Sequence, residues 1–365
     1  MNRPSITLAQ VLDGLRAEQL TQAGDDALAY LDRRPAPQPW YVRAMVGFGA
    51  WLASLMLIGF VTSLSMIAGG GYGIIGALLI TGATLIRQRA DGDFLTQCAM
   101  AASLAGQALL AYAVADSLGY DETEAFLGVA LMMSVTLFFI YPDSVHRVLM
   151  LLLAAGELTG LLYHWEANAL VPLIGPLLAG ALILLMERLP TLAGSRHARL
   201  IQPLASGLML GAFGLLLLST VYLLPELGAE FVFYPRPWIS SLLLGAALLY
   251  LGNRLWPELA DPADARSRRL FLALLLLIAA SAWYAPGLNL GLIVLLLGAR
   301  SGRRSFIGAG ISFFTLFLGA FFYGIEVSLL TKSLTLIISG LAILLARWVI
   351  LRLIATPTTR ETHHA

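Results

Sequence analysis

The chain has 365 residues, of which 58% are hydrophobic and only 12% are charged, and its formal net charge is +1. A soluble domain has about a quarter of its residues charged, so this composition excludes an ordinary soluble enzyme and a disordered protein. Because almost no net positive charge is available to meet a phosphate backbone, it also excludes a nucleic-acid-binding protein. Repeated apolar runs predict instead a protein that crosses a lipid bilayer many times.

Residues 1–39 form the one long polar stretch. Thr7 and Gln10 have the spacing of a capping box, which predicts a short helix, and three closely spaced prolines after it predict a stiff linker. We therefore expect a cytosolic N-terminal helical segment with a Pro-rich linker over 1–39. An all-α transmembrane domain is expected over 40–355, and a cytosolic tail over 356–365.

The transmembrane domain contains about twelve apolar segments, each a candidate membrane-spanning helix. They cover 44–67, 72–86, 94–115, 125–141, 147–163, 168–186, 201–224, 238–256, 270–284, 287–298, 306–323 and 333–354. Several are shorter than the roughly 20 residues that a helix needs to cross the hydrocarbon core. The weakest pair, 270–284 and 287–298, is separated by Ala285 and Pro286. It forms either a complete hairpin or a re-entrant one that stops part-way.

The positions of the basic residues predict the orientation of these segments. If both ends of the chain are cytoplasmic and all twelve segments cross, 21 of the 23 Lys and Arg residues fall in cytoplasmic loops or tails. Only Arg236 and Lys332 then fall on the outer side. This distribution follows the positive-inside rule, so we expect both termini of the chain in the cytoplasm.

Glu157 lies in the middle of the apolar segment 147–163, where insertion of a charged group costs roughly 2.5–3.5 kcal/mol. Such a carboxylate must face protein or a water-filled cavity, and it is a candidate for binding a cation, a proton or the polar group of a solute. The alternative is a structural carboxyl that bonds a polar residue of another helix. Gln97 and Gln107 are the expected partners in that case.

Lys332 is the only lysine in the chain and lies at the outer end of the last segment. Glu326 precedes it by six residues and can pair with it if the connection folds back. We include both, with the nearby Tyr323, as candidates for a substrate or ion pathway, because a lysine here can hold an anionic headgroup or substrate. The alternative is a lysine that only anchors the last helix by extending to water.

The outer connections predicted in this way are acidic. Two basic residues there face eight acids, which are Asp116, Asp121, Glu122, Glu124, Glu166, Glu226, Glu230 and Glu326. Such a face can attract cations or a basic partner, although acidic outer loops also follow from the absence of Lys and Arg. The sequence has no zinc-binding helix, nucleophile elbow or Cys-x-x-Cys motif, so we expect no metal or cofactor and consider an enzyme less supported.

The last quarter of the chain resembles a known family. The aromatic pair Phe322-Tyr323 is followed by Leu329-Leu330 and Lys332-Ser333, and the final helix contains Gly340, Leu344-Leu345 and Arg347. With the upstream Pro286-Gly287-Leu288, this pattern is similar to a bacterial membrane-protein family called domain of unknown function 4401, which is related to a family numbered 2157. The resemblance covers about 285–350. It implies a multi-pass protein of the inner membrane and assigns no activity.

Together these observations predict a twelve-span helical protein of the bacterial inner membrane that binds or moves a small or lipid-like solute. Glu157 and Lys332 would supply polar groups of its pathway. The alternative is a non-catalytic scaffold that assembles with other envelope proteins, since the sequence shows no coupling-ion or nucleotide motif and has small residues suited to helix packing.

Overall fold

The computed structural model is helical throughout the residues that it describes, with no strand among them. These residues are 71–324, apart from short gaps, and scattered positions within 45–63 and 330–344. The gaps are 90–91, 120–121, 193–197, 222–235, 260–263 and 284.

Several predicted features lie outside the described residues. They are the N-terminal segment 1–39, the tail 356–365, most of the predicted spans 44–67 and 333–354, and the residues Glu326 and Lys332.

The described helices follow one another with short connections. They are α4 (Tyr72–Arg89), α5 (Asp93–Leu118), α6 (Glu122–Ile140), α7 (Ser144–His164), the 3-10 turn η1 (Asn168–Leu170), α8 (Val171–Glu187), α9 (Leu189–Leu192), α10 (Ala198–Val221), α12 (Pro237–Leu259), α13 (Ala265–Ser281), α14 (Pro286–Ser301) and α15 (Arg304–Gly324). The ten predicted segments between 72 and 323 each coincide with one of these helices, with η1 and α8 together forming 168–186.

Six of the helices are long and apolar enough to cross a membrane. They are α5, α6, α7, η1 with α8, α10 and α12. Within the described residues, α14 and α15 also contain apolar stretches, Pro286–Ser301 and Arg304–Ala320, which are below the length of a full span. The protein is therefore an all-helical chain with several apolar helices, as its composition predicts.

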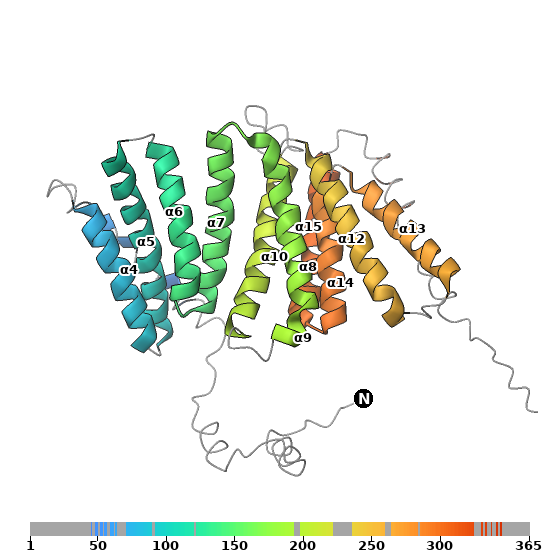
Figure 1. Ribbon diagram of the computed structural model, residues 1–365, viewed down its shortest axis with the longest axis horizontal. Helices are drawn as coiled ribbons and strands as arrows, with labels where there is room; N and C mark the ends of the chain where they lie inside the picture. The colour runs from blue at the N-terminus through green and yellow to red at the C-terminus, as the bar shows by residue number, and fades with distance from the viewer. Residues whose placement is uncertain are drawn as a thin grey trace, which may run out of the picture.

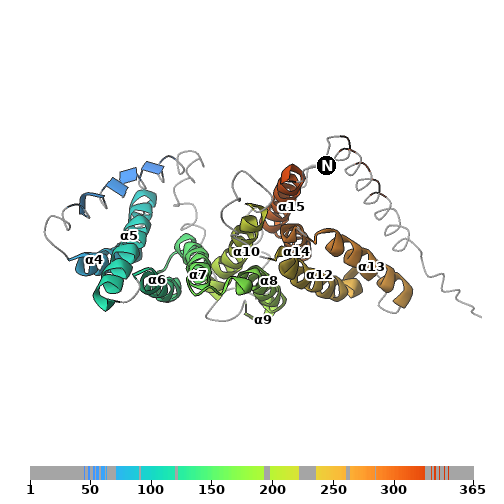
Figure 2. The same cartoon turned by 90° about the horizontal axis from the view of Figure 1, so that it is seen from above.

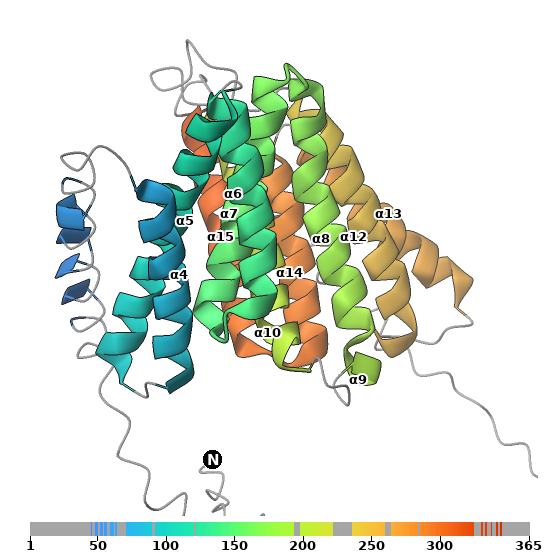
Figure 3. The same ribbon diagram turned by 60° about the vertical axis from the view of Figure 1, so that its left-hand side comes forward.

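The helices stand side by side in an elongated, curved row (Figures 1 and 2). From α4 the row passes through α5, α6 and α7 to α10, and then to a thicker part made of α8, α12, α14 and α15, with α13 at the far end. Figure 3 shows α14 and α15 behind α8 in this thicker part. The row is thinnest at α6 and α7: 22% of the apolar window of α6 is buried, compared with 56% of that of α10.

The main hydrophobic core lies in the thicker part of the row. Leu182 of α8, Leu216 of α10, Leu248 of α12 and Leu290 of α14 belong to it and are completely buried. α15 joins this core through Phe313, whose ring stacks on Phe213 of α10 with 3.8 Å between the ring centroids. These contacts explain how the short helix α14 is held, because apolar neighbours surround it along most of its length.

Two helix pairs approach so closely that only glycine fits between them. A Cβ atom on Gly76 of α4 would lie 2.7 Å from the backbone oxygen of Gly106 in α5. In the second pair, a Cβ on Gly298 of α14 or Gly310 of α15 would lie 2.6 Å from a backbone nitrogen of the opposite helix. Both pairs follow the small-residue pattern of membrane helices.

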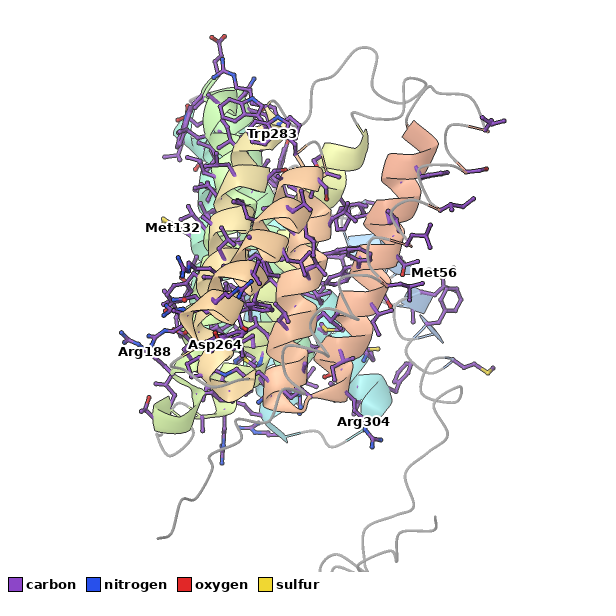
Figure 4. All side chains as sticks on the ribbon, turned by 90° about the vertical axis from the view of Figure 1, so that its right-hand side faces the viewer. Met56, Met132, Arg188, Asp264, Trp283 and Arg304 are labelled. Atoms are coloured by element: carbon purple, nitrogen blue, oxygen red, sulfur yellow. The ribbon has the colours of Figure 1, made fainter. Side chains whose placement is uncertain are left out.

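The connection between α13 and α14 lies at the end of the bundle opposite to the starts of α13 and α15. Figure 4 places Asp264, before α13, and Arg304, at the start of α15, at the same end as Arg188, and places Trp283 at the other end. The chain thus runs along the bundle and back between Asp264 and Arg304. The two arms do not form a tight pair, because α13 packs on α12, whereas α14 packs chiefly on α15 and also on α12.

A proline in α8 is compensated by a side chain of α12. Pro176 has no N–H, so the carbonyl of Pro172, four residues earlier, has no helical donor. Ser240 fills this position, because its buried hydroxyl donates a hydrogen bond of 2.5 Å to the Pro172 oxygen. The proline therefore links α8 to α12 through a hydrogen bond that a regular helix would make internally.

We expect Ser240→Ala to lower the free energy of unfolding by about 1–3 kcal/mol, since it leaves a buried carbonyl unpaired. In a Pro176→Ala background, which restores the internal N–H donor, the same change should cost less than about 1 kcal/mol. Equilibrium unfolding in mixed micelles measures both values. Ser219→Ala is a matched control, because the hydrogen bond of this buried serine within the described residues is to Leu216 O of its own helix. Equal costs of Ser240→Ala in the two backgrounds would contradict the compensation.

Candidate functional site

Glu157 lies at the contact between α7 and α6, in the thin part of the row. Gly160, one turn further along α7, lies against the Leu127 side chain of α6, and this close packing brings the two helices together beside the carboxylate. The hydroxyl of Ser134, a fully buried residue of α6, donates a hydrogen bond of 3.2 Å to Glu157 Oε1. The second oxygen, Oε2, is buried and has no hydrogen-bond partner among the described residues.

The partner of Glu157 differs from those expected from the sequence. Gln107 donates instead to the sulfur of Met150, at 3.4 Å from Nε2 to Sδ, and this thioether is a weak acceptor. Ser134 was not among the expected partners because a serine in an apolar segment often bonds its own helix. The helix register of α6, which only the structure provides, turns Ser134 toward α7.

His146 forms a second polar contact between α5 and α7. Its Nε2 lies 3.0 Å from the hydroxyl oxygen of Ser103, and both residues are completely buried. The ring also stacks on Tyr141, with 3.9 Å between centroids and 19° between planes. His146 Nδ1 and the Tyr141 hydroxyl are both buried without a hydrogen-bond partner in the described part of the chain.

Asp143 positions this histidine. Its Oδ1 accepts hydrogen bonds from the backbone N–H groups of Val145 and His146, so it caps the first turn of α7. Its Oδ2 accepts from Arg87 Nε of α4 at 3.1 Å. One carboxylate thus fixes where α7 begins and ties that end to α4.

The polar residues of α7 lie along one stripe of the helix. His146, Met150 and Glu157 are four and seven residues apart, and at 3.6 residues per turn they face within about 40° of one another. From His146 to Glu157 the stripe rises about 16 Å. Sequence analysis identified Glu157 alone; the spacing of His146 from it is the signal that could have indicated the whole stripe.

The remaining predicted site residues are not brought to Glu157 by the described structure. Tyr323 is in the last turn of α15, whereas Glu326 and Lys332 lie outside the described residues. α10 stands between α7 and α15: it packs on α7 at Gly207, beneath Leu151, and on α15 through Phe213. A shared pathway for Glu157 and Lys332 therefore stays a prediction.

The two ends of the bundle differ in chemistry. At the end that carries Arg188, Glu187 of α8 accepts a hydrogen bond of 3.0 Å from the Tyr250 hydroxyl of α12 and pairs with Arg254 at 3.7 Å. Arg300 pairs with Glu258 at 2.8 Å at this end. We call it the arginine end; Arg87 and Asp143 also belong to it.

The opposite end is aromatic and acidic. There the indole N–H of Trp165 donates to Glu124 at 2.8 Å, and the rings of Trp238 and Trp283 stack. His164 lies 4.0 Å from the same glutamate. Tryptophans of this kind are typical of the membrane–water interface. No group of three or more His, Cys, Asp or Glu side chains suited to a metal occurs in the described part of the chain.

A cavity of about 300 Å³ lies beside α4 and α5, away from Glu157. Its walls include Leu78 and Gly82 of α4 and Cys98 and Ala102 of α5, and they are almost wholly apolar. Gly82 has no neighbour within 4 Å of the position of a Cβ, so it leaves this space open. Such a cavity can hold hydrocarbon but offers no polar group to bind a solute.

The family model for domain of unknown function DUF4401 matches residues 39–353, so the chain belongs to that family. The match extends well beyond the 285–350 region in which the sequence pattern first indicated it, and the predicted resemblance is confirmed. A search of curated proteins finds no match to the chain.

We expect Glu157→Leu to leave the free energy of unfolding unchanged or to raise it by up to about 2 kcal/mol, because it removes the cost of a polar group in an apolar span. Ser134 can then bond a carbonyl of its own helix. Equilibrium unfolding in mixed micelles measures the change, with Glu157→Gln, expected within about 1 kcal/mol of the wild type, as the matched control. If Glu157→Leu instead destabilised the fold by several kcal/mol, the carboxylate would be structural.

Proposed function

We propose that this protein crosses the bacterial inner membrane twelve times, with both termini in the cytoplasm, and binds or moves a small or lipid-like solute at Glu157. The observation that carries the proposal is the Glu157 carboxylate inside an apolar helix, with one oxygen held by Ser134 and the other buried without a partner among the described residues. A carboxyl group inside a membrane span raises the free energy of inserting that helix into the bilayer, so a residue retained there is a candidate for function.

The arrangement of charged residues supports this orientation. Arg188 and Arg304 lie at one end of the bundle and Trp283 at the other, as expected if the arginine end faces the cytoplasm. The alternation of helices between the two ends fits the proposed number of crossings, with the remaining spans supplied by 44–67 and 333–354.

The orientation can be tested by cysteine labelling, because Cys98 is the only cysteine in the chain. In a Cys98→Ser background, Ala167→Cys at the aromatic end should react with a membrane-impermeant maleimide added to spheroplasts. Ser195→Cys, in the connection between α9 and α10, should react only after the membrane is opened. The reverse pattern would show that the arginine end is periplasmic.

The chemistry of Glu157 indicates the kind of solute. A carboxylate oxygen accepts hydrogen bonds and attracts positive charge, so a donor such as an ammonium group is favoured over an anion. The surface of α7 next to this carboxyl is open to lipid, although Oε2 itself is buried: Gly156, which precedes Glu157, is exposed, and a Cβ at that position would meet no atom within 4 Å. We therefore infer that an amphiphilic amine, with its chain in the lipid and its ammonium at Glu157, represents the solute class.

The test uses a fluorescent long-chain amine and the corresponding long-chain carboxylic acid, with the purified protein in proteoliposomes. We expect saturable amine binding that Glu157→Gln weakens by about ten-fold or more, since removing a charge partner costs at least about 1.4 kcal/mol. Thr159→Val is the matched control, because this buried α7 hydroxyl bonds Ala155 O of its own helix and no other described residue. Equal amine binding by the wild type and Glu157→Gln would remove Glu157 from solute recognition.

One observation favours the scaffold alternative. α6 is the least buried of the candidate spans, and its exposed face carries Met132 and Phe139, which are 71% and 63% exposed. A helix of another envelope protein could cover this face, although lipid covers such a face equally well. A photocrosslinking residue at Phe139, compared with one at the exposed Leu277 of α13, distinguishes the two: a stoichiometric protein adduct at 139 alone supports the scaffold.

A further inference from the structure

Buried polar side chains serve different purposes in the two parts of the row. In the thicker part they satisfy backbone carbonyls: Ser240 bonds Pro172 O, Ser241 bonds Ala282 O, and the amide of Asn289 reaches Ser241 O and Ala279 O. The Ser240 bond fills the gap that Pro176 leaves, and the others add a second donor to carbonyls of a neighbouring helix or turn, so each has a structural explanation.

At the junction of α5, α6 and α7, buried polar side chains instead bond one another. The pairs are Ser103 with His146, Gln107 with Met150, and Ser134 with Glu157, and each includes a residue of the α7 stripe. None of these contacts is needed by a backbone group. A side-chain network inside a membrane span is costly unless it is fully paired, which indicates that it has another use.

Unpaired buried atoms occur at both ends of the stripe. At one end are His146 Nδ1 and the hydroxyl of Tyr141, which stacks on the His146 ring, and at the other is Glu157 Oε2; all three lack a partner among the described residues, and Tyr141 and His146 are completely buried. The other atoms of this kind, on Tyr163, Asn168, Trp256 and Asn289, are spread over α7, η1, α12 and α14. Water is a ligand that can both donate to and accept from such atoms, and it bridges buried polar groups in proteins.

We propose that the α7 stripe is a hydrated proton path that connects the arginine end of the bundle to Glu157. The inference rests on the proposed role of Glu157 and names the proton as the ion that this site exchanges. The path begins at Tyr141 and His146, passes Ser103 and Gln107, and ends at Glu157 Oε2. Between the level of Met150 and Glu157 it must cover about 10 Å, the length of three or four waters in line.

The transfer conserves protons at every step. A hydronium ion at the arginine end gives a proton to His146 Nδ1 and becomes water, and the ring releases its other proton from Nε2 to Ser103 Oγ. Ser103 passes its own hydroxyl proton to the next water, and Glu157 Oε2 finally takes up one proton to become a neutral carboxyl. His146 is left with its proton on Nδ1, and it resets when that proton is exchanged through water for one on Nε2.

The charges around the path favour entry at one end only. Three charged residues lie near His146: Arg87 of α4, Asp143, which caps α7, and Arg147 in the first turn of α7. They mark this end of the path as the one that faces water. The charged residues of the neighbouring helices α5, α6, α8 and α10 all lie within about one turn of the helix ends. Beyond the entrance, therefore, Glu157 is the first group that can change its charge.

Infrared spectroscopy of the protein in proteoliposomes tests the path without any solute. The carbonyl band of protonated Glu157 is the one that disappears in Glu157→Gln, and its shift after transfer from H₂O to D₂O reports proton exchange. We expect His146→Phe, which keeps the ring stack on Tyr141 but removes both nitrogens, to slow this exchange by about ten-fold or more. Ser103→Ala should slow it in the same direction.

Thr159→Val is the control that must exchange like the wild type. If His146→Phe is not monodisperse in gel filtration, Ser103→Ala, which leaves the ring in place, decides the result. Unchanged exchange in these variants, equal slowing in Thr159→Val, or the absence of a protonated Glu157 band at every pH at which the protein stays folded would each overturn the proton path. The infrared experiment follows the proton on Glu157 and uses no amine, so its result does not depend on whether the amine binds. Conversely, the amine-binding experiment tests the proposed solute even if proton exchange is unchanged in these variants.

Discussion

A polar group inside an apolar span must find its hydrogen bond within the protein, because lipid offers none. This requirement shapes the thicker half of the molecule residue by residue. Pro176 removes a donor from α8, and Ser240 of α12 replaces it. Ser241 of α12 and Asn289 of α14 bond the carbonyls of Ala282 and Ala279, which already accept a backbone N–H in the turn after α13. Helices in this half are therefore linked by hydrogen bonds from buried side chains to the backbone of a neighbouring helix, and the apolar contacts of the core fill the space between those links.

The same requirement explains why charged groups gather at the ends. The arginines that orient the chain also bond carboxylates between helices, as Arg87 does with Asp143 and Arg300 with Glu258. Each pair lies where water is near, so the cost of removing the charges from water is small, and the gain is correspondingly modest. These pairs chiefly align neighbouring helices with one another. Asp143, for example, caps α7 and also bonds Arg87 of α4.

The sequence predicts the helices well and their neighbours poorly. Apolar runs bounded by charged or turn-forming residues place ten helices within a few residues of their observed ends, because bilayer insertion depends on local composition. Which helices touch depends on packing between residues far apart in the chain. Gln107 therefore has a partner other than the predicted Glu157, and α12 stands between the two arms of the predicted hairpin.

The candidate site shows the same division. Glu157 is identified from composition alone, because a carboxylate in an apolar run is conspicuous. The roles of His146 and Ser134 depend on helix register and on the closeness of α6 at Gly160, which a single sequence does not determine. A histidine at a helix start and a serine in an apolar segment are common in membrane proteins, and only their contacts with one α7 stripe set them apart.

The position of Glu157 in the thinnest part of the row relates the two proposals to each other. In an apolar medium its carboxylate must be neutralised, either by a proton or by a cationic group that binds beside it. Both would occupy Oε2, the proton arriving along the stripe from the arginine end and the ammonium from the lipid beside Gly156. Binding of one would then release the other, so that a single carboxylate with two routes of access would exchange a proton for an amphiphilic cation. A purely structural carboxyl would need neither route of access. The route from the lipid depends on the small number of helices that pack around α7, because a thicker bundle there would close it.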